Sequence, residues 1–426
     1  MRIDVDKVAA VKADFAVDKS QLGEIAAAFR WDLEQGLKKS EFTSLKMLEA
    51  HIAMPEGGEK GKFLTLDFGG TNLRCELIEL QGQGQYQVLR SLKKPLRCED
   101  YDYTHQGVRA EELFDFIAQL LGELVVGSQD TYYLGHTFSF PASQQGIADA
   151  QLLGWTKEFA VTGVVGHNVN QLLQEALLRQ GLSNIHPVAL VNDTVAELLA
   201  AGYVQADTVI GAIYGTGTNC CYMEKIPREG LGRGIINLES GGFNKLMPNE
   251  WDCQLDQQSD NPGEQRLEKM VSGCYLGQLY SLLVQDLLAL SQPVALTTGD
   301  MSVIMADTTA TALGASKFLG EKLQQQLLPG EAAYLREVAE AVTIRSARLT
   351  AAVYGGILWH IGTNQPVSIA IDGSVYQHMP QVQVNVQKAL YEVLGEDAGA
   401  VSLYLLKDGS SLGAAVAAAM TASILQ

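Results

Sequence analysis

The chain has 426 residues, enough for two domains of ordinary size. Apolar residues make up 47% and charged residues 19%, a balance that is typical of a globular protein and excludes a disordered one. The net charge of −18 argues against a surface for nucleic acid or for an anionic membrane. A bound anion would therefore have to be held by local donors, because the overall field repels it.

The predicted elements begin with a helix over residues 19–50. Apolar residues there recur at spacings of three and four: Leu22, Ile25, Phe29, Leu33 and Leu37. Three β-like runs follow, then a helix and a strand: 63–68, 73–80, 86–92, 108–126 and 131–140. This first block alternates strands with a helix.

A second block has a similar order. A helix is expected over 168–180 and a short buried strand over 188–191, after which Asp193 and Thr194 are expected to cap a helix that runs through Ala200. The remaining predictions are two hairpin strands, two mostly helical stretches, a strand, a helix, a strand and a final Ala-rich helix: 208–214, 220–224, 264–290, 308–361, 367–371, 382–394, 401–406 and 414–425. Two similar blocks of alternating strands and helices favour an α/β fold with two related lobes.

The six cysteines form no CxxC pair and show no zinc-like spacing, which favours free buried thiols in a reducing cytosol. The first residues are charged and lack the apolar core of a signal peptide. No apolar run is long enough to span a membrane. These features predict a cytoplasmic protein with neither a nucleic-acid nor a membrane partner.

The same kind of turn occurs twice between apolar runs, as Gly69-Gly70-Thr71-Asn72 and as Thr216-Gly217-Thr218-Asn219. Glycine permits positive φ and close approach of a ligand, and free backbone N–H groups in such a turn can bind an anion. A strand is expected after each turn, which excludes a dinucleotide fingerprint, and no P-loop pattern occurs. The two turns together predict a grip on nucleotide phosphates from two sides.

Longer segments around these turns resemble the hexokinase family of sugar kinases, whose members share the two-lobed actin-like ATPase fold. From about residue 20 to the end, the resembling segments keep the family's order: 46–74, 137–144, 153–159, 191–194, 215–219 and 370–376. The resemblance implies an α/β, ribonuclease H-like fold with a cleft between two domains. It implies a small domain of residues 61–191 plus 410–426 and a large domain of residues 1–60 plus 192–409.

The resemblance also implies an activity, the ATP-dependent phosphorylation of a hexose at its 6-hydroxyl. Glucose is the first candidate, with fructose, mannose and glucosamine as further ones. ATP and Mg²⁺ are the implied cofactors, hexose and ATP the implied partners, and a homodimer is a further expectation. Closure of the two lobes over the sugar would exclude water, which competes with the hydroxyl for the γ-phosphoryl group.

Asp193 is the expected catalytic base, since phosphoryl transfer needs a group that orients the hydroxyl and accepts its proton. The alternative is that Asp193 only caps a helix. Lys157 could stabilise the transferring phosphoryl group or bind the sugar, and the sequence leaves both roles open.

The hydroxyls of a sugar need polar partners in a buried site. The resemblance supplies a sugar-binding set: Ser139, Phe140, Thr156, Lys157, Asn192, Asp193, Asn219, Glu239 and Glu268. For Glu239 and Glu268 the alternative is a solvated acidic side chain, the usual state of a glutamate.

The nucleotide-binding set implied by the resemblance is Asp67, Gly69, Gly70, Thr71, Asn72, Arg74, Gly215, Thr216, Gly217, Thr218, Gly373, Ser374, Ser410, Ser411, Leu412 and Gly413. Asp67 is expected near the Mg²⁺–phosphate group, with no separate metal site in the protein, because Mg²⁺ keeps several waters and uses few carboxylates. Arg74 could offset phosphate charge or pair with a surface acid. Leu412 and Cys274 stand where the family commonly has basic residues, which could weaken ATP binding.

Other classes of function stay open at this point. A sugar-sensing regulatory protein of the same fold would need little catalysis, but it would not need Asp193 and both turns. An actin-like ATPase would have no use for the sugar segments at 137–159. A repressor-linked sugar kinase would carry a Cys-rich zinc motif, which the sequence lacks.

Overall fold

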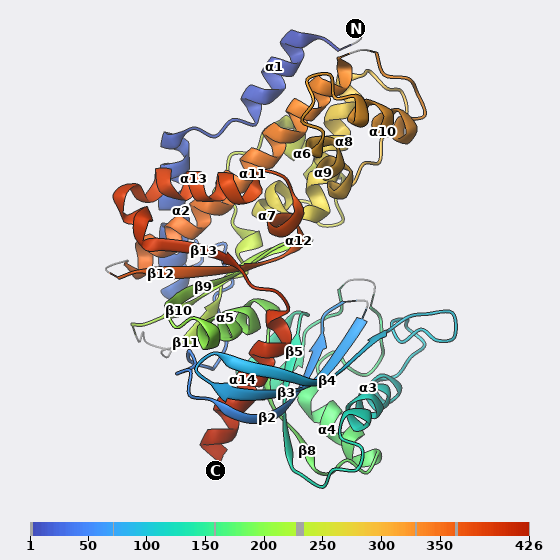
Figure 1. The fold of residues 1–426 in the computed structure, drawn as a ribbon, viewed down its shortest axis with the longest axis vertical. Helices are drawn as coiled ribbons and strands as arrows, with labels where there is room; N and C mark the ends of the chain where they lie inside the picture. Colours follow the sequence, from blue (N-terminus) through green and yellow to red (C-terminus); the bar gives the residue numbers. More distant parts are fainter. Residues whose placement is uncertain are drawn as a thin grey trace.

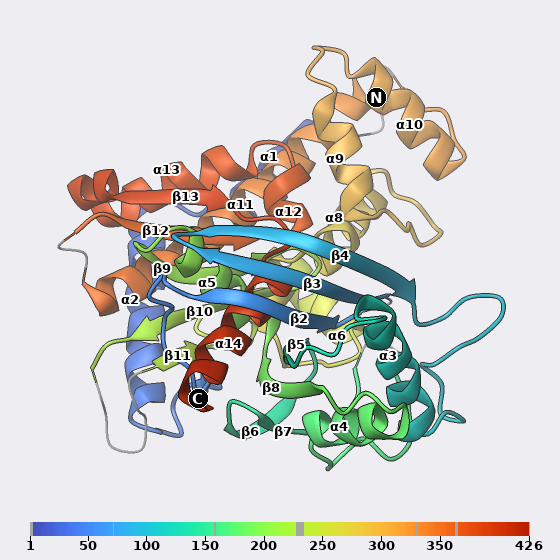
Figure 2. The same cartoon turned by 60° about the horizontal axis from the view of Figure 1, so that its bottom comes forward.

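The computed structural model describes residues 3–70, 72–156, 159–226, 234–328, 330–362 and 365–425. Within them, two separate sheets organise an α/β fold (Figure 1). The first sheet has the order β4-β3-β2-β5-β8, from the strands β2 (Lys60–Phe68), β3 (Asn72–Gly82), β4 (Gln85–Pro95), β5 (Tyr132–Phe138) and β8 (Ile185–Val191). Figure 2 shows β2, β3 and β4 side by side in this sheet.

Helices cover both faces of the first sheet. On one side lie α3 (Ala110–Leu124) and α4 (Val169–Arg179), and on the other lies α14 (Gly409–Leu425). A separate hairpin of β6 (Ala142–Gly146) and β7 (Asp149–Leu152) follows β5. The C-terminal helix therefore covers one face of a sheet whose strands lie more than two hundred residues earlier in the chain.

The second sheet has the order β1-β11-β10-β9-β12-β13, from β1 (Leu48–Glu49), β9 (Thr208–Tyr214), β10 (Thr218–Glu224), β11 (Gly234–Asn237), β12 (Val367–Asp372) and β13 (Val401–Leu405). The helix α5 (Asp193–Val204) packs against β9, β10 and β12. The other helices form the large remaining layer: α1 (Val5–Asp14), α2 (Lys19–Leu37), α6 (Glu250–Gln258), α7 (Arg266–Val271), α8 (Gly273–Leu287), α9 (Thr298–Ala306), α10 (Leu313–Leu323), α11 (Glu331–Ile361), α12 (Ser374–His378) and α13 (Val382–Leu394). Short 3₁₀ turns lie at Ser240–Gly242 and Gly395–Ala400.

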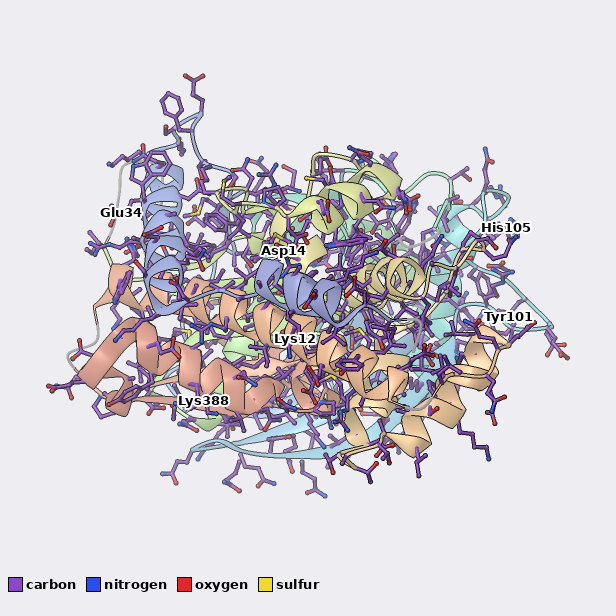
Figure 3. All side chains as sticks on the ribbon, turned by 90° about the horizontal axis from the view of Figure 1, so that it is seen from above. Lys12, Asp14, Glu34, Tyr101, His105 and Lys388 are labelled. Atoms are coloured by element: carbon purple, nitrogen blue, oxygen red, sulfur yellow. The ribbon has the colours of Figure 1, made fainter. Side chains whose placement is uncertain are left out.

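The helix α1 lies across this layer, and Figure 3 shows its Lys12 and Asp14 facing the viewer. Lys12 Nζ lies 2.6 Å from the Glu337 carboxylate on α11. The sequence patterns did not predict α1, because ten residues with two buried valines give little periodicity.

The helices α5 and α14 pack together between the two sheets (Figure 1). Gly413 makes this possible, since a Cβ there would lie 1.9 Å from the Ala196 carbonyl oxygen. Gly135 in β5 likewise leaves room for the Ala414 carbonyl, 1.9 Å from where its Cβ would be. Small residues thus bring the beginnings of two helices from distant parts of the chain close to one another.

The predicted hairpins are confirmed, since antiparallel strands flank each glycine turn, β2 with β3 and β9 with β10. The predicted helix over 19–50 is wrong beyond Leu37, where α2 ends. Lys39 has a φ of 54°, and the buried Asp32 carboxylate accepts the Ser44 N–H at 3.0 Å, so the chain folds back on the helix. These local contacts end α2 at Leu37, although the apolar spacing in the sequence predicts a longer helix.

The cap of α5 also differs from the prediction. Asn192 is the N-cap, and its Oδ1 accepts the Thr194 N–H at 2.9 Å. Asp193 is the first residue of the helix. The amide at 192 already has the extended backbone that an N-cap requires, so it takes this place.

Candidate functional site

The first glycine turn lies at one edge of the first sheet. Strands β2, β5 and β8 run parallel, and Phe68 is level with Phe138 while Thr137 is level with Val191. The residues that follow these strands therefore meet at the same edge. A Cβ on Gly69 would lie 2.4 Å from Ser139 Oγ, so the turn touches a predicted sugar residue directly.

A cluster of aromatic rings packs next to this edge of the sheet. Phe140 is buried, and its ring centroid lies 4.9 Å from Trp155 and 5.0 Å from Phe159. The Trp155 Nε1–H donates to the Val161 carbonyl at 2.8 Å, and the next residue, Thr156, is exposed. Two predicted site residues, Lys157 and Thr71, lie outside the described residues. The ring of Phe140 thus packs as part of the wall behind the turn.

Asn192 and Asp193 begin α5 at the same edge, and both are partly exposed. Asp193 Oδ1 accepts the Thr194 N–H at 2.7 Å and the Thr194 hydroxyl at 3.2 Å. Within the described residues, Asp193 Oδ2 accepts no hydrogen bond. One carboxylate oxygen is therefore fixed by the helix terminus, and the other is open to a ligand.

The second turn brings both predicted sugar glutamates together. The Thr218 N–H donates to Glu268 Oε2 at 3.1 Å, which draws this carboxylate from α7 to the turn. Asn219 Nδ2 donates to Glu239 Oε1 at 3.1 Å. Both glutamates are partly buried and make bonds within the protein, so neither is the freely solvated side chain of the alternative reading.

The second turn also touches the end of β12. Gly373 has a φ of 127°, and a Cβ there would lie 2.4 Å from the Tyr214 carbonyl oxygen, so only glycine fits. Ser374 begins α12 and is exposed. Burial, and then the charges of Asp408 and Asp193, raise the pKa of Asp372. The carboxyl groups of Asp372, Asp408 and Asp193 therefore lie close enough to interact electrostatically.

The beginning of α14 faces the same region. The Thr137 hydroxyl donates to the Ser410 carbonyl at 2.9 Å. Ser411 is 2% exposed, and its Oγ has no hydrogen-bond partner among the described residues. Leu412 is 3% exposed in an apolar cluster with Ala415 and Val416, so its side chain packs in the core.

Arg74 joins β3 to this helix start. It lies opposite Asp67 in the ladder of β2 and β3, and its guanidinium forms an ion pair with the Asp408 carboxylate. Arg74 therefore pairs with a surface acid, as one of its two readings expected, and this acid precedes the predicted nucleotide segment.

Two residues of this region were missed by sequence reasoning. Asn237 donates from Nδ2 to Glu239 Oε1 at 2.9 Å, and its position two residues before Glu239 was the available signal. Glu197 is 1% exposed, and its Oε1 has no partner among the described residues. Burial, followed by the charges of Asp372 and Asp193, raises the pKa of Glu197 well above its usual value. An acidic residue one turn after Asp193 in an otherwise apolar helix was its signal.

The carboxylates of this region suit a metal ion that binds together with a nucleotide. Across the described ranges, no three His, Cys, Asp or Glu side chains are placed to hold an ion alone. Mg²⁺ binds one or two carboxylates and completes its shell with waters and phosphates, so Asp67 beside the first glycine turn fits that donor set.

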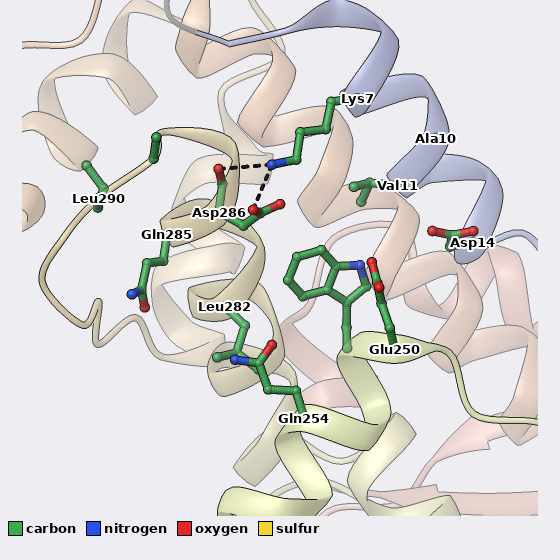
Figure 4. Close-up of a pocket in the computed structure, with 12 residues that line it drawn as sticks. Lys7, Ala10, Val11, Asp14, Glu250, Gln254, Leu282, Gln285, Asp286 and Leu290 are labelled. Carbon is green, nitrogen blue, oxygen red and sulfur yellow. Dashed lines mark hydrogen bonds and ion pairs between the residues drawn. The ribbon is translucent and has the colours of Figure 1, made fainter.

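A cavity of about 690 Å³ lies elsewhere, between α1, α6 and α8 (Figure 4). Lys7 Nζ lies 2.7 Å from the Asp286 carboxylate at its rim. None of the predicted site residues lines this cavity. As for membranes, the helices within the described ranges all fall short of the length and apolar character that a bilayer span requires.

Comparison with known proteins gives a consistent result. Two family models, both described as Hexokinase, match residues 7–203 and 209–420. A curated relative, Hexokinase-7 of Oryza sativa subsp. japonica, is 36% identical over 97% of this chain and 96% of its own length. Among solved structures, a hexokinase crystal structure matches with a TM-score of 0.89 at 32% identity, covering 97% of this chain and 99% of that one. A Schistosoma mansoni hexokinase in complex with glucose matches with a TM-score of 0.83 at 30% identity, covering 97% and 98%.

Proposed function

Since the chain belongs to the hexokinase family of sugar-phosphorylating enzymes, with their two-lobed actin-like ATPase fold, we propose that it phosphorylates a hexose at the 6-hydroxyl. Glucose is the first candidate, and fructose, mannose and glucosamine are further ones. The observation that carries the proposal is the contact of Gly69 with Ser139, because it sets a phosphate turn against the proposed sugar wall.

In the proposed reaction, the oxygen of the sugar 6-hydroxyl attacks the γ-phosphorus of ATP. The bond from that phosphorus to the bridging β–γ oxygen breaks, and ADP leaves. Asp193 accepts the hydroxyl proton, and its open Oδ2 suits this role because Thr194 already holds Oδ1. Lys157 is proposed either to stabilise the transferring phosphoryl group or to bind the sugar.

The nucleotide is proposed to lie between the two glycine turns, with its adenosine end toward Gly373 and the beginning of α14. Bound Mg²⁺ would neutralise phosphate charge, and Asp67 is the residue proposed to hold it. The backbone N–H groups of the turns and the Arg74 guanidinium are the proposed donors to the phosphates. Such local donors are needed because the overall charge of −18 repels an anion.

The sugar is proposed to bind between Ser139 and Thr156 on one side and Asn219, Glu239 and Glu268 on the other. These two groups belong to the proposed small domain, residues 61–191 plus 410–426, and to the proposed large domain, residues 1–60 plus 192–409. Hexose binding would therefore close the cleft and exclude water. Small-angle scattering with and without glucose tests this, since an unchanged radius of gyration contradicts closure. A cytoplasmic location and a homodimer stay predictions.

A coupled assay of ADP release with ATP–Mg²⁺ tests the activity. Glucose, fructose, mannose and glucosamine are compared by kcat/KM, and the same protein without sugar measures ATP hydrolysis alone. Sugar-dependent ADP release with a hexose 6-phosphate product supports the proposal. If all four sugars bind but none stimulates ADP release, the sugar-sensing alternative is favoured instead.

A further inference from the structure

We propose that Asn237 is a positioning residue for sugar binding, which holds the Glu239 carboxylate so that Oε2 alone faces the sugar. The inference rests on the proposed hexose site and adds a residue to it. Asn237 Nδ2 donates to Glu239 Oε1 at 2.9 Å, and Asn237 Oδ1 accepts from Asn219 Nδ2 at 2.8 Å. Asn237 is only 4% exposed, so it supports the carboxylate from behind and does not line the site.

The two amides can be oriented in only one way. Asn219 Oδ1 accepts the backbone N–H groups of Cys220 at 2.7 Å and Ser240 at 3.1 Å, groups that can only donate. Asn219 Nδ2 therefore points to Asn237 Oδ1, which leaves Asn237 Nδ2 for Glu239. A carboxylate only accepts, so the chain of donors ends at Glu239 Oε1.

This network directs both of its N–H donors to one oxygen of the Glu239 carboxylate. Glu239 Oε1 receives two N–H donors, from Asn219 at 3.1 Å and from Asn237 at 2.9 Å. Within the described residues, Oε2 accepts none. An ionised carboxylate with one oxygen saturated presents the other as a fixed acceptor, which is what a sugar hydroxyl requires.

The backbone explains why such support is needed. Glu239 has φ 53° and ψ 50°, a left-handed conformation that costs a non-glycine residue energy. Asn237 is the last residue of β11, level with Cys221 of β10, and the Leu238 N–H donates to the Cys220 carbonyl at 3.0 Å. The supporting amide thus belongs to a rigid strand, whereas the carboxylate that it holds belongs to a strained turn.

The test is a double-mutant cycle read by calorimetric glucose binding and by KM. Asn237→Ala is expected to raise the glucose Kd and KM by about 10- to 100-fold, the usual effect of losing a hydrogen bond to a charged group. The KM for ATP should change by less than about twofold, since Asn237 contacts the second turn through the Asn219 side chain, which is proposed to bind the sugar. In a Glu239→Gln background, the same change should add less than about threefold, because the carboxylate that it positions is gone.

A control separates positioning from general loss of stability. Asn170 is 5% exposed in the other lobe, and its amide also makes two side-chain hydrogen bonds, to His136 and to the Ala148 carbonyl. Asn170→Ala should lower the melting temperature about as much as Asn237→Ala does, but it should leave the glucose Kd unchanged. If Asn237→Ala does not fold, Asn237→Ser, which keeps a smaller hydroxyl donor, is measured in its place.

The outcomes are distinct. If the wild type phosphorylates glucose while Asn237→Ala and Asn237→Ser bind glucose normally, the positioning role is overturned and the proposed activity stands. Equal effects of Asn237→Ala in the Glu and Gln backgrounds also overturn it, since Asn237 would then act independently of Glu239. If the wild type neither binds nor phosphorylates any hexose, the failure lies in the proposed function.

Discussion

Arg74 and Asp408 form an ion pair between β3 and the residue before α14, at the point where the nucleotide phosphates are proposed to bind. The Asp408 side chain is 70% exposed and the Arg74 side chain 26% exposed. An ion pair this exposed contributes little to stability, so a phosphate can replace the carboxylate at low cost. The Asp408 carboxylate would therefore compete with the proposed phosphate for the Arg74 guanidinium.

Removing that competition should tighten nucleotide binding. Asp408→Asn is expected to lower the KM for ATP by about two- to fivefold, since the change removes a negative charge beside the phosphates and frees Arg74. Arg74→Gln should raise it by about tenfold or more, the usual loss for a charge-assisted hydrogen bond. Steady-state kinetics at saturating glucose measure both. An increase in KM for Asp408→Asn would show that the aspartate positions the arginine instead of competing for it.

The proposed base can be tested without disturbing its helix. Asp193→Asn keeps an oxygen that can accept the Thr194 N–H and hydroxyl, so α5 should begin as before. Turnover is expected to fall by about 10²- to 10⁴-fold, the usual contribution of a positioned acid–base group, because an amide cannot accept the proton.

Binding of glucose and ATP by Asp193→Asn, measured calorimetrically, serves as the control for an intact site. Near-normal turnover would leave Asp193 with only its structural role at the start of the helix.

The parts of the fold that depend on local pattern were predictable from the sequence. Both hairpins around the glycine turns follow from apolar runs broken by glycine, and the strands pair as β2 with β3 and as β9 with β10. The end of α2 was not predictable, because it depends on Asp32 meeting Ser44 across a chain reversal. Periodicity alone carries no information on such a contact.

The candidate site shows the same division. Glu239 was found through a motif, but Asn237 was not, because its role depends on hydrogen bonds between the ends of two strands, β10 and β11. Leu412 was assigned to the nucleotide by position in a segment, whereas its side chain is 3% exposed in the core. The side of α14 on which the Leu412 side chain lies decides its burial, and packing of α14 against α5 fixes that side.

Glu197 should make the free energy of unfolding fall as pH rises above the usual glutamate range. Burial and nearby carboxylates raise its pKa in the folded state, so above about pH 4.5 the folded protein binds more protons than the unfolded one. Stability is then lost progressively with increasing pH. Glu197→Gln, which cannot ionise, should be more stable than the wild type at pH 8 and should lose less stability between pH 5 and pH 8.

Urea unfolding at a series of pH values measures this slope for Glu197→Gln. Glu76→Gln is a matched control, because Glu76 is also buried but accepts a hydrogen bond from the Ser91 hydroxyl at 2.7 Å. Parallel slopes for the wild type and Glu197→Gln would contradict a buried, proton-holding carboxyl at this position.

Glu224 should have the opposite effect, at acid pH. Although burial opposes it, hydrogen bonds from His360, the Ile226 N–H and the Tyr222 hydroxyl lower the pKa of Glu224 from 4.5 to about 2. A lowered pKa contributes stability above about pH 4.5, and this contribution is lost as pH falls toward about 2, because the unfolded chain takes up the proton first. The side chain is 3% exposed, so solvent screens this contribution only weakly. Glu224→Gln should therefore be less stable at pH 7 and should show a shallower loss between pH 5 and pH 3 in urea unfolding. An unchanged slope over that range would mean that Glu224 titrates alike in the folded and unfolded chains.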